Sequence, residues 1–144
     1  MISKLLKKNE KGFTLMEMLI VVAIIAVLVA IAIPTFTSSL NKARVATDEA
    51  NIRSGYASVM LDILNNDITT DKTYQLNKDG SVSETTAANA YKTLGKGTAT
   101  EIAGISVAAW ETDKTVTYTY HYNATTAAGS TPAYKAGEIT IGIG

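Results

Sequence analysis

The 144-residue sequence contains no cysteine, two prolines and a single histidine. The absence of cysteine excludes disulfide bridges, thiolate metal sites and cysteine nucleophiles. His121 has no second histidine with which to build a metal site or a catalytic triad, so we predict that it is an exposed strand residue. Arginine occurs only at positions 44 and 53 and no basic block lies beyond the first twelve residues, so no nucleic-acid interface is predicted.

Charge is distributed unevenly, although the formal net charge is zero. The first twelve residues carry four lysines against Glu10, and acidic residues outnumber basic ones in the remainder. A basic segment ahead of an apolar run places the N-terminus in the cytoplasm by the positive-inside rule. We therefore expect the rest of the chain to emerge on the outer face of a membrane.

An apolar run, unbroken from Met18 to Ile33, follows this basic segment. The 24 residues of segment 13–36 would span roughly 36 Å as a helix, which is enough to cross the hydrocarbon of a bilayer. One carboxylate, Glu17, lies at the start of the run. Because a charge costs about 2.5–3.5 kcal/mol at the centre of a membrane helix, Glu17 requires either an interfacial depth or a partner.

Two kinds of processing are consistent with this N-terminus. A signal peptide with the small-x-small site Ala30-Ile31-Ala32 would release a soluble protein beginning at Ile33. A cut between Gly12 and Phe13 would instead keep the apolar run as an anchor. The second interpretation is favoured because Glu17 has no role in a signal peptide and the apolar periodicity continues beyond residue 32.

The segment Lys11-Gly12-Phe13-Thr14-Leu15-Met16-Glu17, with a short basic leader before it and Pro34 inside the apolar helix, resembles the N-terminus of type IV pilins and related pseudopilins. The resemblance covers residues 4–45 closely and the rest only in general layout, and it is to precursors of the type IVa-like kind. It implies that a prepilin peptidase removes leader 1–12 by cleaving after Gly12 and then methylates the new amine of Phe13. Considered alone, Gly12 could also be a flexible link.

The resemblance assigns assembly roles to Glu17 and Pro34. Glu17 would meet the amine of Phe13, on its own helix or on the neighbouring subunit of a fibre, because a matched pair is strong in low dielectric. Alternatively, Glu17 reaches the headgroups and only sets the depth of the helix. Pro34 must kink the helix or remove a hydrogen bond around Ala30. It marks either a segment that can straighten or melt during assembly, or simply the outer membrane boundary.

We predict an α+β fold, in which one helix from about Thr14 to Asn65 packs on a small antiparallel sheet. Its first half, residues 13–36, spans the membrane and forms the fibre core, its amphipathic half covers residues 37–65, and the globular head covers residues 66–144. Apolar residues at three- and four-residue spacing should form the face of the helix that contacts the sheet. They are Phe36, Leu40, Ala43, Ala46, Ala50, Ala57, Met60, Leu61 and Leu64, with Lys42, Arg44, Asp48, Glu49, Arg53 and Asp62 as the polar positions.

The pattern of the head predicts short strands, one helix and a buried tyrosine stripe. The strands are expected at Tyr74–Leu76 and Ser81–Ser83 around an Asp79-Gly80 turn, then at Ile102–Trp110, Lys114–Tyr122 and Glu138–Ile143, with a helix at Glu84–Leu94. On the second-last strand, Val116, Tyr118, Tyr120 and Tyr122 should face the long helix. No calcium loop is predicted, because an EF-hand register on Gly80 places Gln75 and Thr86 where carboxylates are needed.

The predicted function is structural, without catalytic activity, cofactor or metal. The resemblance implies a homopolymeric pilus fibre used for adhesion, motility or biofilm formation, with the prepilin peptidase, an assembly platform and its ATPases as further partners. The precursor would lie in the cytoplasmic (inner) membrane with its head outside, and the mature subunit in a cell-surface pilus. Alternatives are a pseudopilin of a type II secretion or competence system, a minor pilin, or, from another class, a secreted or singly anchored binding domain.

Overall fold

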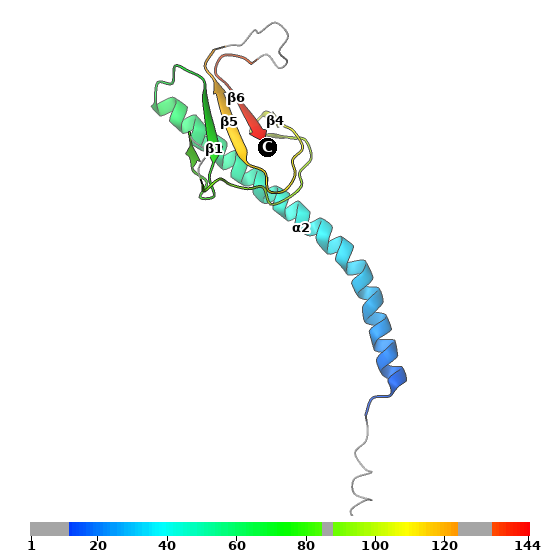
Figure 1. The fold of residues 1–144 in the computed structure, drawn as a ribbon. Helices are drawn as coiled ribbons and strands as arrows, with labels where there is room; N and C mark the ends of the chain where they lie inside the picture. Colours follow the sequence, from blue (N-terminus) through cyan, green and yellow to red (C-terminus); the bar gives the residue numbers. More distant parts are fainter. Residues whose placement is uncertain (1–11, 85–87, 124–133) are drawn as a thin grey trace, which may run out of the picture. The chain divides into compact units, whose positions relative to one another are not determined.

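The computed structural model describes residues 12–84, 88–123 and 134–144, which form one long helix and six strands (Figure 1). The fold class is α+β, as predicted. Of the predicted leader 1–12, all but Gly12 lies outside the described residues. The elements are α2 (Leu15–Asn65), β1 (Lys72–Leu76), β2 (Val82–Ser83), β3 (Thr100–Ile102), β4 (Ile105–Val107), β5 (Val116–His121) and β6 (Glu138–Ile143).

The chain divides into two compact units, one ending at Ser39 and the other running from Leu40 to Gly144. The first unit contains the apolar part of α2, whose large side chains between Leu15 and Ile33 are all exposed. Pro34 lies inside the helix, and the helical assignment continues through it. This part of α2 therefore presents apolar surface on every side, as expected of a helix that is covered by lipid or by other helices.

The second unit contains an antiparallel sheet with the strand order β2-β1-β5-β6 and a separate β3–β4 hairpin (Figure 1). The predicted strand Glu138–Ile143 is confirmed, and so is the turn at Asp79-Gly80, where Gly80 has a φ of 82°. The single strand predicted at Ile102–Trp110 is wrong. Ala103 and Gly104 form a two-residue turn with positive φ at both positions and split that region into β3 and β4.

The core of this unit lies between α2 and the sheet. The hydroxyl of Tyr118, on β5, donates a 2.7 Å hydrogen bond to the backbone carbonyl of Ile52 on α2. A Cβ placed on Gly55 would lie 2.7 Å from Leu76 Cδ1 and 2.8 Å from Tyr118 Cζ. The close approach of β1 and β5 to the helix therefore requires glycine at position 55, because any side chain there would occupy the space that Leu76 and Tyr118 fill.

The face of α2 that contacts the sheet differs from the predicted one. Its buried residues are Asp48, Ile52, Gly55 and Val59, whereas the predicted alanine and leucine stripe is exposed except for the half-buried Met60. The larger branched side chains remove more apolar area from water than alanine does, and this outweighs the regular spacing of the alanines. The leucines of the predicted stripe are exposed as well, because β1 and β5 approach the helix at Gly55, which lies on another side, and spacing alone does not show this.

The helix predicted at Glu84–Leu94 is also wrong for the residues that the structure describes, 85–87 lying outside them. The amide of Tyr91 donates to the carbonyl of Leu76, and the amide of Lys78 donates to the carbonyl of Asn89. Backbone groups that pair with the end of β1 in this way are not available for bonds along a helix.

The tyrosine stripe on β5 is confirmed at its centre but not at its end. Val116 and Tyr118 are buried, whereas Tyr122 is exposed. The exposed position predicted for His121 is wrong, since the residue is only 8% exposed. Its ring stacks on that of Tyr134 with a centroid distance of 3.9 Å, and its Nε2 atom lies 3.2 Å from Thr140 Oγ1.

Candidate processing and assembly site

The peptide bond between Gly12 and Phe13 lies in an exposed, non-helical segment that directly precedes α2. The side chain of Phe13 is 79% exposed. A Cβ placed on Gly12 would meet no atom within 4 Å, and the backbone there is not left-handed. The fold itself therefore does not require glycine at position 12.

Thr14 and Glu17 form a reciprocal capping box at the start of α2. The amide of Glu17 donates to Thr14 Oγ1 at 3.2 Å, and the amide of Thr14 donates to Glu17 Oε2 at 3.0 Å. The first backbone bond of the helix runs from the amide of Met18 to the carbonyl of Thr14 at 3.2 Å. Two amides that would otherwise lack partners are satisfied, which typically contributes about 1 kcal/mol to the helix terminus.

This arrangement adds a role for Glu17 that the sequence interpretation missed, although the pattern Thr-x-x-Glu before an apolar run signals it. Residues four positions apart share a face only when both lie within one helix. Phe13 lies before the start of α2, so it does not share a helical face with Glu17. Among the described residues, no hydrogen bond reaches Glu17 Oε1. One carboxylate oxygen caps the helix, and the other remains available to a donor from outside the subunit.

Two threonine hydroxyls that follow Pro34 donate to backbone carbonyls that precede it. Thr35 Oγ1 bonds to the carbonyl of Ile31 at 3.2 Å, and Thr37 Oγ1 bonds to the carbonyl of Ile33 at 2.6 Å. Pro34 has no N–H, so the carbonyl of Ala30 loses its usual helical partner. The helix continues here, and the hydroxyl groups of both threonines are hydrogen-bonded to its own backbone. Polar side chains in an apolar segment need such partners.

The head contains a second polar cluster that the sequence interpretation missed, centred on Asp48. This residue was predicted on the polar side of α2, yet its side chain is 0% exposed. Its two carboxyl oxygens accept hydrogen bonds from the Tyr91 hydroxyl at 2.6 Å and from the amides of Leu94 and Gly95 at 2.8 and 2.9 Å. Trp110 Nε1 is a fourth donor at 3.4 Å. Asp48 therefore ties the segment that follows β2 to the long helix.

Burial raises the pKa of Tyr91 to about 12, and its hydrogen bond to Asp48 acts in the same direction. A carboxyl group with several donors and no neighbouring base resembles a structural anchor more than a catalytic site. Across the described ranges, no group of three or more histidine, cysteine, aspartate or glutamate side chains is arranged to hold a metal ion.

One helix among the described residues, α2, is long and apolar enough to cross a membrane. Its most apolar window has a mean hydropathy of 3.0, and none of that window is buried inside the structure. The capping box therefore lies at the N-terminal end of a helix of membrane-spanning character.

Comparison with known proteins identifies relatives of the N-terminal part of the chain. Residues 7–33 match the family described as the prokaryotic N-terminal methylation motif. The type IV narrow pilus major component PilA5 of Thermus thermophilus is 50% identical over 52 residues, which cover 34% of this chain and 45% of that protein. The type IV major fimbrial protein FimA of Dichelobacter nodosus is 40% identical over 60 residues, which cover 40% of this chain and 38% of that protein.

The chain spans less than half the length of the curated relatives it matches. No solved structure matches it. An exposed apolar helix that begins within a methylation motif and continues into an α+β head defines a pilin-like class of subunit. The N-terminal region of this chain is that of a type IV prepilin, and the resemblance drawn from its sequence is confirmed.

Proposed function

We propose that this chain is a structural subunit that polymerises through α2 into a type IV pilus on the cell surface. The observation that carries the proposal is the Thr14–Glu17 capping box, which opens an exposed apolar helix inside the matched methylation motif. The printed names of the relatives, a major pilus component and a major fimbrial protein, support a fibre-forming role.

Processing is proposed at the peptide bond between Gly12 and Phe13. A prepilin peptidase would remove residues 1–12 on the cytoplasmic side and methylate the amine of Phe13. The bond is exposed and non-helical, so it can enter a protease cleft without unfolding α2. Packing within the subunit does not explain why residue 12 is a glycine. This supports the proposal that the peptidase requires a glycine on the N-terminal side of the bond it cuts.

Assembly is proposed to use the oxygen of Glu17 that the capping box leaves available. After cleavage, Phe13 of an incoming subunit carries a cationic amine that can donate to Oε1 while Oε2 still caps the helix. In the low dielectric between packed helices, a matched cation and carboxylate attract each other much more strongly than at a surface. An unmatched carboxylate in the same place would be costly, so the pair also fixes the register between subunits.

The remaining parts of the chain take the roles expected from the sequence. Residues 13–36 would anchor the precursor in the cytoplasmic membrane and then line the fibre core, residues 37–65 would carry the head, and residues 66–144 would form the fibre surface. Pro34 would allow the apolar helix to adjust on leaving the bilayer, because the carbonyl of Ala30 has no amide to hold it. An assembly platform and its ATPases are the proposed partners in that step.

Two matched variants separate capping from pairing. Glu17→Gln keeps an oxygen that can accept the Thr14 amide but removes the charge, whereas Thr14→Ala breaks half of the capping box and keeps the charge. We expect both variants to be processed and Thr14→Ala to form fibres at near the wild-type level. The fibre yield of Glu17→Gln should fall by about tenfold or more, which corresponds to a loss of roughly 1.4 kcal/mol or more. Sheared fibres are quantified against mature protein in the membrane. Normal fibre yield from Glu17→Gln would refute the pairing.

A further inference from the structure

The first residue of α2 that is hydrogen-bonded to another part of the described chain is Asn41. Every described residue before it, from Gly12 to Leu40, is exposed. Asn41 Nδ2 donates to the backbone carbonyl of Lys96 at 3.1 Å, and the amide of Lys96 donates to Asn41 Oδ1 at 2.9 Å. The side-chain amide of Asn41 therefore holds both backbone groups of one residue in the head.

Residues 91–97 form a strap that runs along α2 from Asp48 to Asn41. Buried and exposed residues alternate along the strap, as in an extended chain with one side turned inward. At one end the hydroxyl of Tyr91 donates to Asp48, and at the other end Lys96 pairs with Asn41. The strap thus contacts two successive turns of the helix.

Between these two ends the strap touches the helix backbone itself. A Cβ placed on Gly95 would lie 2.8 Å from the amide nitrogen of Val45 and 2.9 Å from its Cγ2 atom. Asn41, Val45 and Asp48 are spaced by four and three residues, so they share one face of α2. All three contacts of the strap therefore lie in one line along the helix.

The strap is also fastened to the sheet. Gly97 and Trp110 exchange two backbone hydrogen bonds, each of 3.0 Å. The amide of Thr93 donates to the carbonyl of Lys114 at 3.0 Å. Segment 110–114 lies just before β5, which is an inner strand of the sheet. The strap therefore connects residues 41–48 of α2 to the sheet through backbone bonds.

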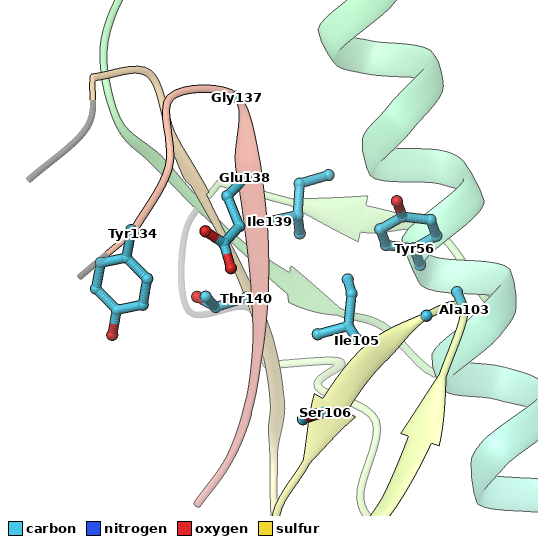
Figure 2. A pocket seen from close by; sticks show the side chains of 10 residues that line it. Tyr56, Ala103, Ile105, Ser106, Tyr134, Gly137, Glu138, Ile139 and Thr140 are labelled. Atoms are coloured by element: carbon cyan, nitrogen blue, oxygen red, sulfur yellow. The ribbon is translucent and has the colours of Figure 1, made fainter. Parts of the chain in front are cut away.

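Other segments that lie beside α2 do not contact it so closely. A cavity of about 540 Å³ lies between Tyr56 of α2, the β3–β4 hairpin and the start of β6 (Figure 2). The helix therefore has open space on one side at Tyr56, whereas the strap reaches its backbone at Val45.

The cost of unwinding α2 from its N-terminal side rises at residue 41. Up to Leu40, unwinding breaks only bonds within the helix, and Pro34 has already removed one of them. Unwinding of Asn41 also breaks its two bonds to Lys96. The next turns add the contact of Val45 with the strap and then the bonds of the buried Asp48.

We propose that the strap is a clamp that stops the unwinding of α2 at Asn41. The helix before Asn41 can open and lengthen when a subunit is pulled or leaves the bilayer, and the helix from Asn41 onward stays attached to the sheet. The inference rests on the proposed function, since it limits how far the adjustment at Pro34 extends. A residue rises by about 1.5 Å in a helix and about 3.3 Å when extended, so the clamp also limits how much each subunit lengthens.

Hydrogen exchange of the full mature chain in detergent tests the clamp without any need for fibres. In a helix the amides of Val45, Ala46 and Thr47 bond to the carbonyls of residues 41–43, and the amide of Ile52 bonds to that of Asp48. In Asn41→Ala we expect the first three amides to exchange about three- to tenfold faster, which corresponds to roughly 0.7–1.4 kcal/mol. The exchange of Ile52 should not change.

The substitution separates the clamp from helix propensity, because the two predict opposite signs. Alanine favours a helix more than asparagine does, so propensity alone predicts slower exchange in Asn41→Ala. Lys42→Ala, at the exposed neighbouring position, keeps the clamp and is the control, for which no faster exchange is expected.

Slower or unchanged exchange at residues 45–47 in Asn41→Ala would overturn the inference. So would an equal increase at Ile52 and in β5, which would indicate that the whole head is destabilised. Failure of correctly processed wild-type subunits to form fibres would instead overturn the proposed function, and the exchange measured on dissociated subunits does not depend on that result.

Discussion

At the scale of single residues, Glu17 connects the subunit to its proposed neighbour. Its Oε2 atom caps α2 through Thr14, and its Oε1 atom accepts no bond from the described residues. Because Oε1 takes no part in the cap, it can receive an amine while Oε2 keeps its bond to the Thr14 amide. Here the two roles are compatible, so the capping box can persist from precursor to fibre.

Among the carboxyl groups of the head, Asp48 is expected to be the one whose substitution lowers the stability most. Asp48→Asn places an NH₂ group where only donors approach, so at least one buried donor loses its acceptor at a cost of about 1–3 kcal/mol. Denaturant unfolding of the full chain in detergent, followed by the near-ultraviolet circular dichroism of the head, measures the change. Glu49→Gln, next to it on α2 and partly exposed, is the control and should change stability by less than about 0.5 kcal/mol. Equal effects of the two substitutions would contradict the anchoring role.

Gly55→Ala separates helix propensity from packing. Alanine should favour an exposed helix by roughly 1 kcal/mol over glycine. At this position its methyl group would overlap Tyr118 and lie 2.7 Å from Leu76 Cδ1, so overpacking should make the variant less stable than wild type by about 1–3 kcal/mol. The thermal midpoint of the head measures this, with Ser54→Ala on the exposed face of α2 as the control. A higher midpoint for Gly55→Ala would show that the sheet does not approach the helix so closely.

At the scale of elements, the β3–β4 hairpin depends on a strained turn. Ala103 has a φ of 53° and is followed by Gly104 with a φ of 79°. Two-residue hairpins with positive φ at both positions favour Asn-Gly. We therefore expect Ala103→Asn to stabilise the head by about 0.5–1 kcal/mol and Ala103→Val, which is β-branched, to destabilise it. Denaturant midpoints of the two variants check the order, and the reverse order would contradict the turn assignment.

Elements defined by local signals could be predicted from the sequence. The start of α2, the Asp79-Gly80 turn and β6 each depend on residues within a few positions of one another. The helix expected at 84–94 failed because the backbone of Tyr91 pairs with Leu76, and nothing near it in the sequence indicates that partner.

At the scale of the whole molecule, the main feature that the sequence did not reveal is which side of α2 faces the sheet. Which side is buried depends on Tyr118 and Leu76 entering the space left by Gly55, and this is a contact between distant segments. The buried Asp48 follows from the same choice, because it lies on that side of the helix and meets Leu94 and Gly95 there. The N-terminal motif could be recognised because its residues are contiguous, whereas the capping geometry of Thr14 and Glu17 was overlooked.

The head should unfold in alkali because several tyrosines resist deprotonation in the folded state. Burial raises the pKa of Tyr91 from 10.0 to about 12, and burial raises those of Tyr74 and Tyr118 further. Each group ionises more readily in the unfolded chain, so its contribution to stability is fully present below pH 10 and is lost as the pH rises through the folded pKa. Tyrosinate absorbance and circular dichroism should show these tyrosines titrating together with unfolding above pH 10. Complete tyrosine titration while the head remains folded would contradict this.

The central claim is that the chain is cut between Gly12 and Phe13 to make a fibre subunit. Intact-mass spectrometry and N-terminal sequencing of the protein in sheared surface fibres test it most directly. The account predicts a chain that begins at Phe13 and carries one additional methyl group on its amine. A mature protein that begins at Ile33 would instead be a released domain, one that retains Met1 would be a simple anchor, and either result would contradict the account.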